Sequence, residues 1–234
     1  MTGMPDAAEV ERRLEEVRAK RGYLLPHHGL LAIAAPGLLK GYDAAYTALA
    51  LTPRLMHERP KEFIWLAVLT ACDEAIATHH IKKFRDAGGT DAEIELAIRL
   101  AGFAEGAPRY AFAAEKWGHH LPAYDRARAY RAALDALQAG SDVARGLVEV
   151  AMAAVHTTRK GWWELALHIR GAYDEGVPEL ELAEGISYAM FPGSIPNFVD
   201  ACAVWQGMVA RGEVPASEAF RIWGADAANQ TGFG

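Results

Sequence analysis

An internal repeat with a constant offset of 88 residues constrains this chain more than any other feature. The segment HIKKFRDAGGTDAEIELAIRLAGFAEGAPRYAFAAEKW, at 80–117, aligns without a gap to HIRGAYDEGVPELELAEGISYAMFPGSIPNFVDACAVW, at 168–205. The matched pairs include His80 and His168, Gly88 and Gly176, Pro108 and Pro196, and Trp117 and Trp205. Gly and Pro mark specific backbone requirements, so their coincidence predicts two similar structural units.

The repeated units are predicted to be helical. Apolar residues recur three and four positions apart nearly everywhere, and strand-like alternation rich in Val, Ile and Thr is absent. The capping box TDAE at Thr90–Glu93 marks the start of one helix. We predict an all-α fold with helices over 6–20, 27–35, 37–51, 60–71, 73–87, 91–104, 108–117, 123–139, 142–157, 162–175, 179–190, 195–211 and 216–224.

The repeat also sets the expected domain organisation. Tyr42 and Tyr130 share the 88-residue offset, so each unit includes the preceding helix. We expect an N-terminal helical extension, a first repeat, a second repeat, and a C-terminal helix and tail. The corresponding ranges are 1–35, 36–118, 122–206 and 207–234.

Charge and cysteine content narrow the classes of function. The net charge is −6 and the Lys and Arg residues are scattered, which disfavours a nucleic-acid surface. The two cysteines do not form a disulfide framework, so a reducing cytoplasm is the expected compartment. The N-terminal segment is charged and lacks the apolar core of a signal peptide, and no apolar run reaches the roughly 20 residues that span a membrane.

The second repeat carries the clearer candidate site. Glu164 and His168 are four residues apart, on one helical face, and Glu149 precedes them on the neighbouring predicted helix. A carboxylate beside an imidazole fixes its tautomer and is expected to raise its pKa, which suits a proton shuttle. On spacing alone, the alternative is a solvent-exposed pair worth a few tenths of a kcal/mol.

The spacing resembles the signature of the alkylhydroperoxidase D-like superfamily, which includes the carboxymuconolactone decarboxylases. That signature is Glu, eleven residues, Cys-x-x-Cys, three residues, His, and a Gly eight residues later. Glu149, His168 and Gly176 fit it, while Gly161 and Glu164 stand at the two cysteine positions. Decarboxylase-like members commonly have glutamate at the second position. The resemblance implies two tandem helical repeats of this type and a homo-oligomer, either a dimer or a trimer.

The resemblance implies a lyase or isomerase that needs no cofactor and acts on a small carboxylated lactone or oxo acid from aromatic breakdown. His168, oriented by Glu164, would protonate the dienolate left by loss of CO₂, and Glu149 would complete the relay. The substrate carboxylate would bind Arg159, Lys160 or Arg170. The alternatives are a peroxidase-type oxidoreductase and a non-catalytic binding protein with an aromatic-lined pocket.

The first repeat departs further from this signature. By the repeat register, His80 is the motif histidine and Lys61 holds the glutamate position. Counting from Cys72 instead places the histidine at His79 and the glutamate near Glu62, with a one-residue slip near Thr78. Ala75 stands where a resolving thiol would be, which disfavours dithiol chemistry. At a helix start Cys72 would be a reactive thiolate; among apolar neighbours it would be a small buried hydrophobe.

Three pairs of adjacent histidines raise the possibility of a metal site. They lie at 27 and 28, 79 and 80, and 119 and 120. None has the His-x-x-x-His or Glu-x-x-His spacing of helical metal ligands, so we expect no metal there. His27 and His28 precede the first repeat, where an N-terminal extension could cover a pocket. Adjacent helical residues point about 100° apart, so only one of His79 and His80 faces a given pocket; we favour His80.

Overall fold

The computed structural model describes residues 6–226, and within that range helices and the turns between them make up the whole chain. The all-α fold is therefore confirmed. Spatial contacts divide the chain between Pro53 and Arg54 into two compact units. No helix among the described residues has the length and apolar character needed to cross a membrane.

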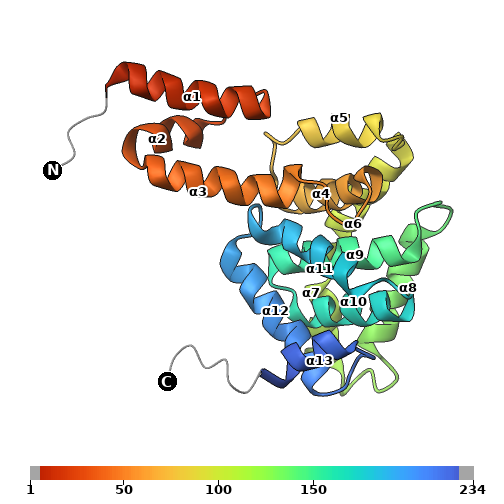
Figure 1. Cartoon of the computed structure of the whole chain (residues 1–234). Helices are drawn as coiled ribbons and strands as arrows, with labels where there is room; N and C mark the ends of the chain where they lie inside the picture. Colours follow the sequence, from red (N-terminus) through yellow and green to blue (C-terminus); the bar gives the residue numbers. More distant parts are fainter. Residues whose placement is uncertain (1–5, 227–234) are drawn as a thin grey trace. The chain divides into compact units, whose positions relative to one another are not determined.

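The first unit contains the N-terminal helices (Figure 1). Helix α2 packs against both α1 and α3, and the last turn widens into a π-helical segment. Apolar side chains of α1, α2 and α3, such as Val17, Ala32 and Leu39, form its core. The elements are α1 (Ala7–Arg21), α2 (Pro26–Ala34), α3 (Pro36–Tyr46) and η1 (Thr47–Leu51).

The second unit is built around two helices that pack against each other, α4 (Glu58–Ala71) and α9 (Arg145–Arg159). Both are buried along most of their length because apolar residues occupy nearly every face. Helices α5 and α6 pack on α4, whereas α10 and α11 pack on α9. The remaining elements are α5 (His79–Asp86), α6 (Asp91–Gly106), α7 (Pro108–Trp117), α8 (Arg126–Gln138), α10 (Trp162–Asp174), α11 (Glu179–Ser187), η2 (Tyr188–Met190), α12 (Ile195–Ala210) and α13 (Glu218–Ala225).

Helix boundaries agree with the periodicity except in one segment. The predicted capping box is present: Thr90 accepts a hydrogen bond from the Glu93 amide and Glu93 accepts one from the Thr90 amide. The helix expected over 73–87 is wrong at its start, because α5 begins only at His79. Asp73 has a left-handed backbone (φ 54°) and the Glu74 carboxylate accepts from the Ile76 amide, so the chain turns here.

The 88-residue repeat stays a prediction. Helices α4 to α7 follow one another in the same order as α9 to α12, which is what the offset predicts. The paired helices differ in length, however: α5 has 8 residues and α10 has 13. The helix expected to open the first repeat, α3, belongs to the N-terminal unit.

Candidate active site

A buried carboxylate–imidazole pair joins α9 to α10. His168 Nδ1 lies 2.7 Å from Glu149 Oε2, and the two residues are 0% and 1% exposed. An ionised carboxylate only accepts hydrogen bonds, so His168 Nδ1 carries the proton and donates it to Glu149. The pair joins two residues that the sequence proposed. Glu164 and His168 are both buried, so the alternative of a solvent-exposed Glu164–His168 pair is wrong.

Two arginines hold the other lone pairs of Glu149. Arg131 Nη1 donates to both carboxylate oxygens, at 2.7 and 2.8 Å, and Arg145 Nε donates to Oε1 at 2.7 Å. Arg131 comes from α8 and also donates to the Leu167 carbonyl at 2.5 Å. Charge-assisted hydrogen bonds of this kind satisfy a buried carboxylate and keep it ionised.

Gly171 leaves the space that this arrangement needs. A Cβ at Gly171 would lie 2.5 Å from Glu149 Oε2 and 2.8 Å from Arg131 Nη2, closer than real Cβ contacts. The missing side chain on α10 therefore allows the carboxylate and the guanidinium to lie directly against the helix backbone.

The charge states follow from burial and from these hydrogen bonds. Burial raises the pKa of Glu149, but the hydrogen bonds from His168 and Arg131 outweigh it and bring that pKa to about 2. Burial lowers the pKa of His168 below its usual value, even though Glu149 opposes this shift. The expectation of a raised histidine pKa is wrong, because complete removal from water disfavours the imidazolium more than the carboxylate favours it.

The second ring nitrogen of His168 is also occupied. Tyr130 Oη, from α8, lies 2.7 Å from His168 Nε2 and 2.9 Å from His156 Nε2. All three side chains are buried, and the two imidazole rings are stacked with centroids 5.4 Å apart. Burial raises the pKa of Tyr130, and the charge of Glu164 adds to this shift, so the phenol keeps its proton. Burial lowers the pKa of His156 well below its usual value.

The sequence suggested that Glu164 orients His168, and this prediction is wrong. Both nitrogens of His168 are taken, by Glu149 and by Tyr130. Glu164 is 6% exposed and lies near the turn between α9 and α10. A Cβ at Gly161 would lie 3.1 Å from Glu164 Oε2 and 2.7 Å from His156 Nδ1, so these two atoms lie next to the same glycine.

A second carboxylate–imidazole pair lies between α4 and α5. His80 Nδ1 is 2.5 Å from Glu62 Oε2, and both side chains are buried. The His80 ring stacks on Trp65, with centroids 4.8 Å apart. Glu62 therefore stands at the glutamate position of the signature, and the repeat register that placed Lys61 there is wrong by one residue. The difference arises because the chain turns before His79, where α5 begins.

The surroundings of this second pair are less complete. Glu62 Oε1 lies 3.6 Å from Lys61 Nζ and 4.0 Å from Lys83 Nζ, without a hydrogen bond within the described part of the chain. Trp65 Nε1 is likewise buried without a hydrogen-bond partner there. Among residues 6–226, this pair has neither the two-arginine clamp nor the tyrosine bridge of the Glu149–His168 pair.

Cys72 lies at the end of α4, not at the start of a helix. Burial raises the pKa of its thiol, which disfavours the alternative of a reactive thiolate. Cys72 and Cys202 are both free thiols.

The other histidine pairs do not converge with further ligands. His27 and His28 lie in α2 of the N-terminal unit, while His119 and His120 lie exposed after α7. Within residues 6–226, no three His, Cys, Asp or Glu side chains are placed to hold one metal ion.

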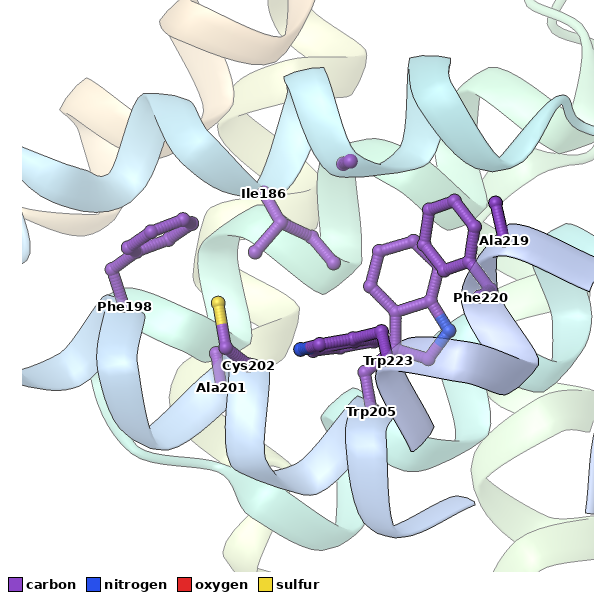
Figure 2. A pocket seen from close by; sticks show the side chains of 9 residues that line it. Ile186, Phe198, Ala201, Cys202, Trp205, Ala219, Phe220 and Trp223 are labelled. Carbon is purple, nitrogen blue, oxygen red and sulfur yellow. The ribbon is translucent and has the colours of Figure 1, made fainter. Parts of the chain in front are cut away.

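Two of the cavities in the second unit differ in character. A polar cavity of about 320 Å³ borders the Glu149 end of the network. An apolar pocket of about 240 Å³ lies between α11, α12 and α13, where Figure 2 shows aromatic side chains and Cys202 around it. The polar cavity is lined by Arg131, Asp135, Arg145, Glu149, Gly171, Asp174 and Glu175.

Comparison with known proteins supports the fold and the family resemblance. The family model of the carboxymuconolactone decarboxylase family matches residues 36–118, the part that contains Glu62 and His80. A segment of 64 residues is 39% identical to a nitrosuccinic acid decarboxylase, npaB, from Metarhizium robertsii. The matched segment is 26% of this chain and spans 45% of that relative, less than half its length. No solved structure gives a significant match.

Proposed function

We propose that this protein is a decarboxylase that works by acid–base chemistry on a small carboxylic acid. The observation that carries the proposal is the buried hydrogen bond between His168 and Glu149, held by Arg131 and extended by Tyr130. The match to the carboxymuconolactone decarboxylase family and the similarity to a decarboxylase support the same class of reaction.

Decarboxylation requires a place for the electron pair and then a proton at carbon. The C–C bond to the carboxylate breaks, CO₂ leaves, and the electron pair passes to a nitro, oxo or lactone carbonyl group on the substrate. The resulting nitronate or enolate takes one proton at carbon from the enzyme. The Glu149–His168 network relays that proton: buried His168 is neutral at rest, and the ionised carboxylate stabilises the imidazolium that forms only while the proton passes.

The substrate carboxylates need cationic partners. Of the three candidates from the sequence, Arg170 pairs with Glu213 at 3.0 Å, and Arg159 pairs with Glu105 and with the Ala71 carbonyl. Lys160 ends α9 in a left-handed conformation (φ 59°) directly before Gly161. We propose Lys160 as the residue that attracts the substrate carboxylate, because its ammonium has no ion pair within the described residues and adjoins the turn.

A peroxidase that uses Cys72 alone has less support. Thiol redox chemistry starts from a thiolate, and burial holds the pKa of Cys72 above its usual value. A second thiol is also needed to close the cycle, and Cys72 and Cys202 are not bonded to each other.

The proposal is tested by measuring CO₂ release. The purified protein is incubated with nitrosuccinate, with a β-oxo acid and with a carboxylated lactone, and headspace CO₂ is followed against each acid alone. Release above the uncatalysed rate with at least one of these acids supports the proposal. Absence of release with all three, together with peroxide reduction that requires Cys72, would replace it with the redox alternative.

A further inference from the structure

The hydrogen-bond chain has two ends, and only one of them suits an anionic substrate. It runs from Glu149 through His168 and Tyr130 to His156, with contacts of 2.7, 2.7 and 2.9 Å. At the Glu149 end lies the polar cavity, and at the His156 end lies the turn at Gly161. The sequence did not single out His156 as a site residue.

The cavity at the Glu149 end repels a carboxylate. Its wall contains four acidic side chains and two arginines, a net charge of −2. The arginine N–H groups that face Glu149 already donate hydrogen bonds to its carboxylate, and Arg145 Nη1 also donates to Asp135 at 2.6 Å. This end can exchange protons with solvent, but neither charge nor free donors favour an acid there.

The number of protons available to these four side chains sets which atom donates in each hydrogen bond from Glu149 to His156. Glu149 is ionised, so the neutral His168 carries its proton on Nδ1 and accepts at Nε2. The Tyr130 hydroxyl has one proton, which it donates to His168 Nε2. Tyr130 Oη then accepts from His156 Nε2–H. The Nδ1 of His156 is consequently an acceptor, and no hydrogen bond within residues 6–226 uses it.

This acceptor lies directly against the turn at Gly161, on a side chain that is 1% exposed. A Cβ at Gly161 would be 2.7 Å from His156 Nδ1. The nitrogen therefore lies directly against this half-buried turn, where any residue other than glycine would clash with it. Glu164 Oε2 lies against the same glycine. A positive charge, that of Arg159, acts on His156, and Lys160 precedes the turn. The surroundings of Nδ1 therefore combine a turn without a side chain, nearby cations and the Glu164 carboxylate.

We propose that His156 Nδ1 is the atom that exchanges the proton with the substrate, and that Tyr130 links His156 to the buried His168–Glu149 pair. This inference rests on the proposed decarboxylase function and names the group at which that function contacts the substrate. His156 is then the catalytic residue, whereas Tyr130 and His168 act through it.

The proton balance is complete along this chain. Before protonation of the carbanion, His156 carries H on Nδ1, Tyr130 donates to His156 Nε2, and His168 is imidazolium beside Glu149. His156 Nδ1–H gives its proton to carbon. His156 Nε2 takes the Tyr130 proton, Tyr130 takes the His168 Nε2 proton, and His168 returns to the neutral form. One proton from solvent restores the imidazolium, which matches the one proton that decarboxylation consumes.

The test separates the two nitrogens of His156. In His156→Gln the amide Nε2 takes the place of the ring Nε2 and still donates to Tyr130, but the base at Nδ1 is lost. We expect kcat for CO₂ release to fall by about 10²-fold or more with KM changed less than about threefold, the scale of a lost general acid. Tyr130→Phe should lose kcat similarly, while the control Tyr173→Phe, which loses a hydroxyl bonded to Glu179, keeps wild-type kcat.

A measurement without substrate keeps this inference separate from the proposed function. Long-range ¹H–¹⁵N correlation spectra of the wild-type protein report the tautomer of each histidine. We expect the Nε2–H form for His156 and the Nδ1–H form for His168. A protonated Nδ1 on His156, or full activity of His156→Gln, would overturn the inference even if the protein is a decarboxylase. The predicted tautomers in a protein that releases no CO₂ would support the proton chain and reject the decarboxylase function.

Discussion

His80 Nδ1 lies 2.5 Å from Glu62 Oε2, so the segment that matches the family model, residues 36–118, contains its own buried carboxylate–imidazole pair. A second pair, Glu149 and His168, lies between the other central helix and its neighbour. The two pairs differ in what surrounds them. Glu149 accepts hydrogen bonds from two arginines, whereas Glu62 has one oxygen that is buried without a hydrogen bond among the described residues.

Replacing Gly171 tests the close packing beneath Glu149. In Gly171→Ala the new methyl group would meet Glu149 Oε2 at 2.5 Å, and because Glu149 is clamped by Arg131 it cannot move freely. We expect a loss of unfolding free energy of about 1–3 kcal/mol, the usual cost of overpacking. Urea denaturation measures it.

The matched control for this change is Gly102→Ala. Gly102 is also inside a helix, α6, but a Cβ there would meet nothing within 4 Å. Alanine should stabilise that helix by up to about 1 kcal/mol, because glycine is the poorer helix former. Equal effects of the two substitutions would argue against the packing at Gly171.

Buried His168 and half-buried His79 predict a loss of stability in mild acid. Burial lowers the pKa of His79 to about 4 and also lowers that of His168. Below about pH 6.5 the unfolded chain therefore binds protons at these histidines that the folded chain does not bind. Their contribution is fully present above pH 6.5 and is lost as the pH falls toward 4. Glu149, with a pKa of about 2 against the usual 4.5, loses its contribution only below pH 4.5.

Urea unfolding at pH 7.5, 6 and 4.5 checks this pH dependence. The free energy of unfolding should decrease at each step, and His79→Gln should make the decrease smaller. A free energy of unfolding that rises between pH 7.5 and 4.5 would contradict the burial of neutral histidines.

Cys72 is predicted to be dispensable for turnover. Its thiol lies at the end of α4 with a raised pKa, and it forms no disulfide. Cys72→Ser should therefore keep kcat for CO₂ release within about threefold, and reaction of the thiol with iodoacetamide should be slow at pH 7. Rapid alkylation, combined with loss of turnover on modification, would contradict this account.

The sequence was sufficient for the local features of the fold. Helix positions follow from the spacing of apolar residues, and the Thr90–Glu93 capping box is formed as predicted. The failure at 73–78 has a local cause, because Asp73 adopts a left-handed backbone although the surrounding residues favour helix. That turn also explains why the repeat register gave Lys61 where the structure has Glu62.

The site depends on tertiary contacts, which explains what the sequence missed. Glu149 and His168 were identified from family spacing, but the partners Arg131 and Tyr130 come from α8 and converge only after folding. His156 gave one signal, a histidine inside an apolar helix. The histidine pKa was predicted in the wrong direction because spacing does not reveal complete burial.

We propose that the Glu149–His168 pair, rather than the Glu62–His80 pair, supports decarboxylation. The most direct test compares kcat for CO₂ release by His168→Gln and His80→Gln, with circular dichroism confirming that each variant is folded. We predict that His168→Gln loses about 10²-fold or more, since proton transfer fails, while His80→Gln stays within about threefold of wild type. The reverse result, with His80→Gln inactive and His168→Gln active, would contradict this proposal and place the reaction in residues 36–118, the segment that matches the family model.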